Sequence, residues 1–430
     1  MRKSNLTLKL LLLSAILIFS AGILKAQYLW NSDSAYKAGA PNSGRLWGYA
    51  FSDYYYKGHS DSLNRGGSNQ YSGIPQSRTA FQFRRIYLGY DYNINKTFSA
   101  EVLLAAENDY PTGNAPATTT TATGDLLQDN NLTFYIKLMN LRWKNIWKGT
   151  DLVVGQVATP AFPLLSEKIW NYRDIERTIS DIRRTPSFDM GATLQGRFDP
   201  KANFGYDVMV GNGTQAKPES DNFKWFYGDV YGKFLDKHLI LDLYADYNRL
   251  NWVPTWHHSR QMLKGFIAYT SKPLTVGVEG FINNLKNDNF ASKIAGGVDT
   301  LSVAAKGISF YVHGDIIPDK LRFFARLDLY NPNNIVNNSV YNKYVGNTGN
   351  YNDNSYDGAT GTTATGDETY KQMFISGGLD FSPAKNIHIM PNIWYERYST
   401  QLTTANTDHD LVYRMTFFYS FGKDYSKQYY

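Results

Sequence analysis

The chain has 430 residues, 19% of them charged, and no cysteine; Lys plus Arg number 44 and Asp plus Glu 38. The lack of cysteine excludes disulfide scaffolds, thiol catalysis and cysteine-ligated metal centres. The mean hydropathy of -0.42 argues against a bundle of membrane helices, since each spanning helix needs roughly 20 mostly apolar residues. Aromatic residues reach 15%, enough apolar surface to argue against a disordered chain.

The N-terminal segment is predicted to be a secretory signal peptide. A basic start is followed by an apolar run over 10–24 and by small residues that suggest cleavage after Ala26. Residues 1–26 carry four bases and no acid, so the net charge falls from +6 to +2 in the mature domain, 27–430. A nearly neutral mature chain gives no support for nucleic-acid binding, which needs a clustered basic face.

The mature chain alternates apolar and polar side chains with a period of two, which is typical of β-strands with two different faces. In 239–250, for example, Leu241 and Leu243 share one face while Asp242 and Asp246 share the other. Strands of this kind are predicted at 44–56, 81–92, 97–107, 132–143, 150–157, 188–198, 203–211, 223–234, 239–250, 260–270, 274–284, 303–314, 321–330, 371–381, 387–398 and 410–421. The fold class is therefore all-β.

The connections between these strands alternate between short turns and long polar loops. A closed up-and-down barrel that crosses a bilayer predicts this alternation, with turns at one end and loops at the other. Tyr and Phe also gather at strand ends, as in the aromatic girdles of such barrels. We therefore expect a transmembrane antiparallel β-barrel of about 16 strands. The alternative is a soluble protein of two stacked sheets, which periodicity alone does not exclude.

Four segments resemble the phosphate-selective porin O and P family of Gram-negative outer membranes. The most specific is a Gly-Gln-x-x-x-Pro stretch followed by a Glu-Arg segment. The segments are FRRIYLGYDYNINKTFSAEV at 83–102, VVGQVATPAFPLLSEK at 153–168, ERTISDIRRTPSFDMGATLQGRF at 176–198 and YDVMVGNGT at 206–214. The resemblance implies a sixteen-stranded, trimeric diffusion channel whose third external loop folds inward to narrow the pore.

The third long loop, 158–187, is the predicted constriction. It has helix-like content over 164–184, with Ser166 as a candidate helix cap. Fixed charges in a narrow passage act strongly on a passing ion, because water screens them less there. The candidate constriction residues are Lys168, Arg173, Arg177, Arg183 and Arg184, with the acids Glu176 and Asp181. One hypothesis is an arginine cluster that favours anions; the other is that these charges pair with one another.

The strand phases also predict which charged side chains line the pore. The predicted lining residues are Arg85, Lys137, Arg197, Lys264, Arg322, Arg326, Arg414, Asp242, Asp246 and Glu279. With the other inward residues of both signs (Lys233, Asp91, Glu101, Asp207, Asp229, Asp328, Asp380 and Glu396), the wall is mixed and slightly acidic. A continuous basic track is not traceable, so phosphate specificity is not inferred.

The sequence thus predicts an outer-membrane porin for passive diffusion of small hydrophilic solutes, with anions as a candidate class. The alternatives are a substrate-specific channel and a surface protein that binds through its loops. No Ser and His are placed together by the strand phases, so an enzyme is not expected, and no cofactor or metal is implied. Expected partners are outer-membrane lipid, small solutes or ions, two further copies of the chain, and the barrel-assembly machinery, which would recognise the aromatic last strand ending at Phe421.

Overall fold

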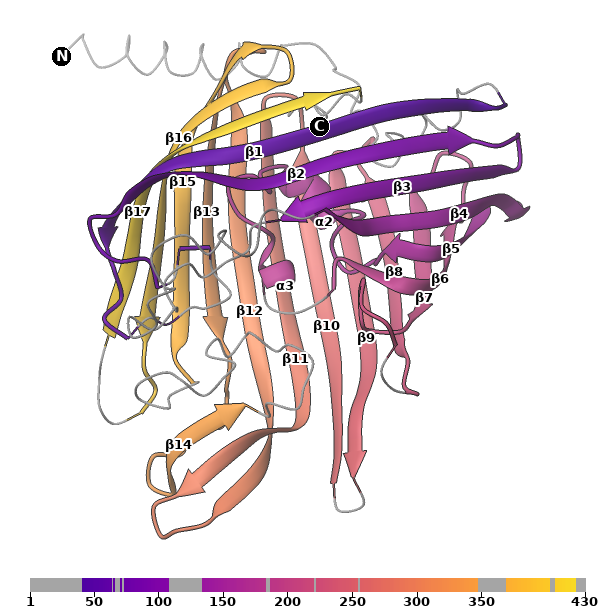
Figure 1. The fold of residues 1–430 in the computed structure, drawn as a ribbon. Coiled ribbons are helices and arrows are strands. Elements are labelled where there is room, and N and C mark those ends of the chain that lie inside the picture. Colours follow the sequence, from indigo (N-terminus) through magenta and orange to yellow (C-terminus); the bar gives the residue numbers. More distant parts are fainter. Residues whose placement is uncertain are drawn as a thin grey trace, which may run out of the picture.

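The computed structural model describes residues 41–63, 65, 70–71, 73–107, 134–182, 186–219, 222–253, 256–346, 369–402 and 407–422. Sixteen antiparallel strands form a closed barrel, and two short helices lie inside it (Figure 1). The barrel strands are β1 (Ser43–His59), β2 (Thr79–Asn93), β3 (Phe98–Glu107), β4 (Tyr135–Trp147), β5 (Thr150–Ala158), β6 (Phe188–Arg197), β7 (Phe204–Gly211), β8 (Trp225–Phe234), β9 (Leu239–Val253), β10 (Trp256–Thr270), β11 (Leu274–Lys293), β12 (Val298–Ile317), β13 (Leu321–Asn331), β15 (Lys371–Ala384), β16 (Ile387–Ser399) and β17 (Thr407–Phe421).

The ring closes because the first strand pairs with both the second and the last. Gly48 of β1 lies opposite Leu88 of β2 and opposite Phe421 of β17. Each of the other barrel strands likewise has a hydrogen-bonded neighbour on both sides. A closed sheet has no row of unpaired backbone groups, which is the condition for a β-structure to reside in hydrocarbon.

The two faces of the wall differ as the period-two pattern predicts. On β9, Leu243 is 64% exposed on the outside, whereas the neighbouring inward side chain of Asp242 is 1% exposed. On β13, Leu329 is exposed, and Arg326 and Asp328 are buried inside. Large apolar side chains thus cover the exterior, and charged side chains fill the interior, the reverse of a water-soluble protein.

The predicted strands are confirmed, but one further strand was missed. β14 (Tyr341–Gly346) lies within the predicted loop 331–370 and pairs with the end of β11. β11 and β12 are each 20 residues long and run well into the predicted loop 285–302. Together the three form a lobe beyond the barrel, at the bottom of Figure 1. No bilayer imposes an apolar face on strands that leave the wall, so their alternation is weak.

The helices are α2 (Ser166–Trp170) and α3 (Ile179–Ile182), both within the long connection between β5 and β6. The expected cap at Ser166 is wrong, because Leu165 is the N-cap residue and no side chain caps the helix. Neither helix is long and apolar enough to cross a membrane, and the same holds for every helix in the described part of the chain. The predicted signal peptide, 1–26, lies outside the described residues.

The apolar exterior leads to a prediction about lipid. In lipid vesicles, Leu243→Arg should lower the free energy of unfolding by about 2–4 kcal/mol, because it places a charge four residues into β9 on the outer face. The matched control is Leu235→Arg in the β8–β9 turn, also exposed, where a cost of about 0–1 kcal/mol is expected near the interface. Urea titration of vesicle-bound protein measures both. Equal costs at the two sites would contradict a lipid-facing wall.

Candidate functional site

The loop between β5 and β6 lies inside the barrel and is packed against one side of it. Ile169, Trp170, Tyr172 and Ile175 are fully buried, and the rings of Trp170 and Tyr311 on β12 have centroids 5.1 Å apart. Two polar contacts join the loop to the same side. His313 Nε2 lies 2.9 Å from the Ile169 carbonyl oxygen, and the Tyr172 hydroxyl donates to Asp380 Oδ2 at 3.1 Å. The apolar side of the loop thus fills the interior beside β12, β13 and β15.

Three inward arginines hold the main chain of the loop and are here called the arginine clamp. Each donates a hydrogen bond to a carbonyl oxygen within 174–177. The bonds run from Arg84 of β2 to Asp174 at 2.6 Å, from Arg326 of β13 to Arg177 at 2.5 Å, and from Arg414 of β17 to Ile175 at 2.6 Å. A hydrogen bond from a charged donor contributes about 1.5–3 kcal/mol, so the clamp is a strong anchor.

Glu176 lies inside the clamp with its carboxylate enclosed by donors. It accepts hydrogen bonds from Trp394 Nε1 at 3.0 Å and from Gln70 Nε2 at 3.1 Å. Arg177 Nε is 3.8 Å from Glu176 Oε1. Burial alone would raise the pKa of Glu176, but the positive charges of Arg177, Arg84 and Arg414 and the hydrogen bond from Trp394 together outweigh burial, and the pKa lies below its usual value. Glu176 is therefore ionised at neutral pH and ties loop to wall.

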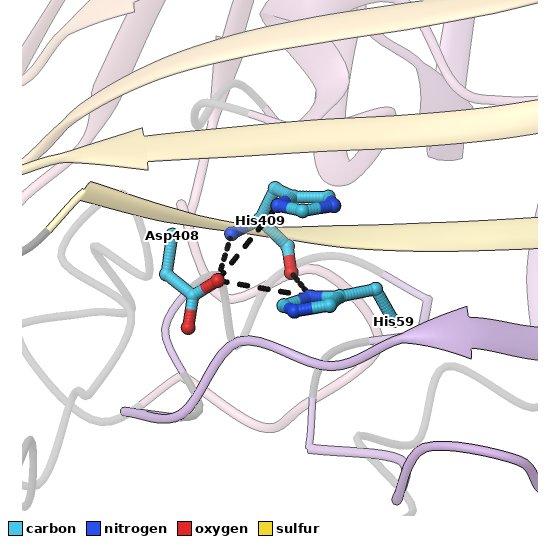
Figure 2. Close-up of side chains that lie close together, drawn as sticks. All are labelled: His59, Asp408 and His409. Carbon is cyan, nitrogen blue, oxygen red and sulfur yellow. Dashed lines mark hydrogen bonds and ion pairs between the residues drawn. The ribbon is translucent and has the colours of Figure 1, made fainter.

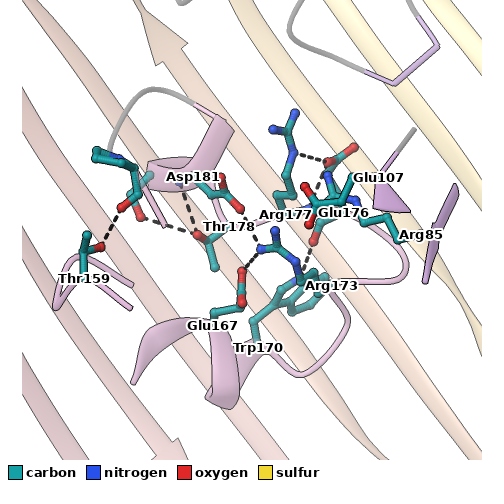
Figure 3. A network of polar contacts seen from close by, with 12 residues as sticks. Arg85, Glu107, Thr159, Glu167, Trp170, Arg173, Glu176, Arg177, Thr178 and Asp181 are labelled. Carbon is teal, nitrogen blue, oxygen red and sulfur yellow. Dashed lines mark hydrogen bonds and ion pairs between the residues drawn. The ribbon is translucent and has the colours of Figure 1, made fainter. Parts of the chain in front are cut away.

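Arg173 is the central charge on the other side of the loop. Its guanidinium forms ion pairs with Glu167 and, at 2.7 Å, with Asp181 Oδ2 (Figure 3). Pairing among the loop's own charges, the second of the two hypotheses, thus occurs at this residue. Arg183 and Arg184, the other predicted bases of the cluster, lie outside the described residues.

Beside this charged face of the loop lies a cavity of about 630 Å³, here called the lateral cavity. It is lined by β3 to β6 and reaches the short turns at Lys96 and Gly149. Its charged lining consists of Lys96, Lys137, Arg142, Lys144, Lys168, Arg173, Arg197, Glu101, Asp151 and Glu167. Seven basic and three acidic side chains leave an excess of four positive charges.

Ion pairs offset part of this charge. Lys137 pairs with Glu107 and Arg173 pairs with Asp181, and because these two acids are not part of the lining they lower the excess to two. Lys168 and Arg197 form no ion pair with any residue that the structure describes, and both are partly exposed. Lys168 and Arg197 therefore contribute uncompensated positive charge to the lateral cavity.

All ten predicted pore-lining residues lie on the inner face, but few of them line the lateral cavity. Lys137 and Arg197 do. The others contact neighbouring wall or loop groups: Lys264 with Asp242 (2.9 Å), Glu279 with Ser180 Oγ (2.7 Å), Arg322 with Asp315 (3.0 Å), Asp246 with Tyr244 (2.7 Å), Arg85 with Glu107 (3.7 Å), and Arg326 and Arg414 with the loop. Many of the inward charged side chains therefore stabilise the wall and the loop.

Arg84 is a further inward residue that the strand phases did not predict. The register of β1 and β2 shifts so that Phe51 lies opposite Arg85 and Ser52 opposite Phe83, which leaves Arg84 as the extra residue of a β-bulge. A bulge breaks the period-two phase, and Arg84 and Arg85 are therefore both buried. Two adjacent arginines in a strand were the one available signal, because an apolar outer face has no place for either.

Solved structures with the same architecture are outer-membrane channels. The outer membrane channel DcaP of Acinetobacter baumannii has a TM-score of 0.55 and 11% identity, over 89% of this chain and 98% of that one. Salmonella typhi OmpF, in complex with daunomycin, has a TM-score of 0.52 and 11% identity, over 88% of this chain and 98% of that one. The anion-selective porin from Comamonas acidovorans has a TM-score of 0.50 and 10% identity, over 88% of this chain and 100% of that one. The chain has the porin fold.

No protein-family model matches the chain, and no curated protein sequence does. The resemblance to the phosphate-selective porin O and P family is therefore supported only as far as the porin fold. At identities of 10–11% the similarity shows the fold alone.

The arginine clamp predicts how the loop can be loosened. The chain has no cysteine, so Lys168→Cys gives a single site for a spin label. Arg414→Met removes the bond to the Ile175 carbonyl, and we expect it to make the label more mobile, because about 1.5–3 kcal/mol of anchoring is lost. Arg142→Met is the control, since that arginine bonds Asp151 and Gln195 on the wall. Unchanged spectra for Arg414→Met would contradict an anchoring role.

Proposed function

We propose that the protein is a porin of a Gram-negative outer membrane, through which small hydrophilic solutes diffuse passively. The closed barrel, the apolar exterior and the fold shared with outer-membrane channels support this function. Diffusion down a gradient needs no cofactor and no covalent step, so the protein acts as a channel and not as an enzyme.

The proposed pathway runs through the lateral cavity, between the loop and β3 to β6. The observation that carries this proposal is the asymmetry of the loop: one side is anchored to the wall, and the other faces a cavity with seven basic and three acidic side chains. A confined passage with low-dielectric walls focuses the field of such charges. The pathway therefore favours anions, and Lys168 and Arg197 contribute most to this preference.

The assembly is proposed to be a homotrimer, inserted by the barrel-assembly machinery through β17. Four outward residues of this last strand are aromatic and exposed: Tyr413, Phe417, Tyr419 and Phe421. β17 also makes the closing pair with β1, so its recognition would precede closure.

Charge removal in the cavity tests the proposed selectivity. In a salt gradient across a planar bilayer, Lys168→Gln with Arg197→Gln should shift the reversal potential toward cation permeation. A charge about 4 Å from an ion is worth about 1 kcal/mol in water, or about fivefold in relative permeability per charge. Lys217→Gln, in an exposed loop, is the control and should leave the potential unchanged. No shift in the double variant would remove these residues from the selectivity mechanism.

Salt concentration provides an independent test. The Debye length is about 10 Å at 0.1 M salt and about 3 Å at 1 M. The anion preference should therefore be stronger at 0.1 M than at 1 M at a fixed concentration ratio. A preference that stays constant over this range would point to size or specific binding instead of fixed charge.

A further inference from the structure

A second polar cluster lies on the seam where the first and last strands close the barrel, far from the lateral cavity. In β1, Lys57 lies opposite Val412 and His59 opposite Leu411, so Gly58 is the extra residue of a bulge. A bulge re-aims the side chains next to it. Here it brings His59 beside the first residues of β17.

His59, Asp408 and His409 converge at this point (Figure 2). One ligand atom from each side chain lies within 4.8 Å of the other two. Asp408 Oδ1 is 3.7 Å from Nδ1 of both histidines. The two imidazole rings are stacked, with centroids 4.0 Å apart and planes 7° apart. Neutral imidazole nitrogens are common ligands of transition metals.

The surrounding hydrogen bonds orient the three groups. His59 Nδ1 lies 2.7 Å from the His409 carbonyl oxygen, and as a donor there it leaves a lone pair on Nε2. Metal-bound histidines commonly donate their other nitrogen to such a carbonyl. Asp408 Oδ2 accepts from Ser62 N at 2.9 Å and Oδ1 from His409 N at 2.8 Å. Each carboxylate oxygen keeps a second lone pair.

We propose that His59, Asp408 and His409 form a binding site for a divalent transition-metal cation, with Zn²⁺ as the preferred ion. Two imidazoles and one carboxylate suit Zn²⁺ and Cu²⁺ and are a poor match for Ca²⁺ or Mg²⁺, which take oxygen ligands. Because the two ring planes are nearly parallel, one imidazole has to rotate before both in-plane lone pairs point at one ion. The donors would then lie about 2.0–2.2 Å from the ion. Side-chain exposures of 19–35% leave room for water as a fourth ligand.

Binding here would fasten the seam. The ligands come from β1 and β17, which are neighbours in the ring but lie 349 positions apart in the chain between His59 and Asp408. An ion held by both strands binds the closed barrel and not the open one, so it must raise the melting temperature. This role is independent of solute diffusion and of the lateral cavity.

Isothermal titration of ZnCl₂ into the full chain in detergent tests the site, after chelator treatment and with no polyhistidine tag. We expect one Zn²⁺ per chain and a higher melting temperature with Zn²⁺. His59→Ala and His409→Ala should each weaken binding at least about tenfold, since even residues behind the ligands cost 10–100-fold. His238→Ala, a lone histidine in the β8–β9 turn, is the control and should bind Zn²⁺ as the unaltered protein does.

Two further measurements keep the result decisive. Asp408→Asn preserves the shape of the side chain and should also weaken binding, so the test does not depend on alanine variants that fold poorly. Electron paramagnetic resonance of bound Cu²⁺ should show two nitrogen ligands in the unaltered protein and one in either histidine variant. Absence of Zn²⁺ binding, or equal affinity in the unaltered protein and both histidine variants, would overturn the proposal.

Discussion

Closure of the hydrogen-bonded ring is the constraint on which the rest of the molecule depends. β1 pairs with β2 on one side and β17 on the other, so every barrel strand has hydrogen-bonded neighbours on both edges and has an inner and an outer face. The outer face can then be apolar, because no backbone group there needs water. The same geometry confines charged side chains to the interior, where they must form ion pairs, contact water or hydrogen-bond to the loop.

The interior divides along these lines. On one side the charged side chains are held in hydrogen bonds: the arginine clamp bonds loop carbonyls, and Glu176 is enclosed by donors. On the other side, Lys168 and Arg197 face the lateral cavity. The charges of the wall nearly cancel in the sequence but are uneven in space, because Arg84 and Arg326 on the anchored side pair with Asp53 and Asp328, whereas Lys168 and Arg197 do not form such pairs within the described residues.

The sequence predicts local properties well and long-range ones poorly. Alternation sufficed for all sixteen barrel strands and for the inward direction of residues such as Lys264 and Asp242. It failed at Arg84, where a bulge shifts the phase, and at β14, which pairs outside the wall. The clamp joins residues up to 239 positions apart. Nothing in either segment alone indicates that Arg414 would meet the Ile175 carbonyl.

Anchoring through carbonyl oxygens has a consequence for evolution. Every residue type supplies the same main-chain oxygen, so substitutions at exposed positions of the loop need not dislodge it. An acidic residue could replace Lys168 while Arg84, Arg326 and Arg414 keep their hydrogen bonds to the loop. A lineage with this scaffold could therefore change the charge preference of the channel through few mutations, with little loss of folding stability.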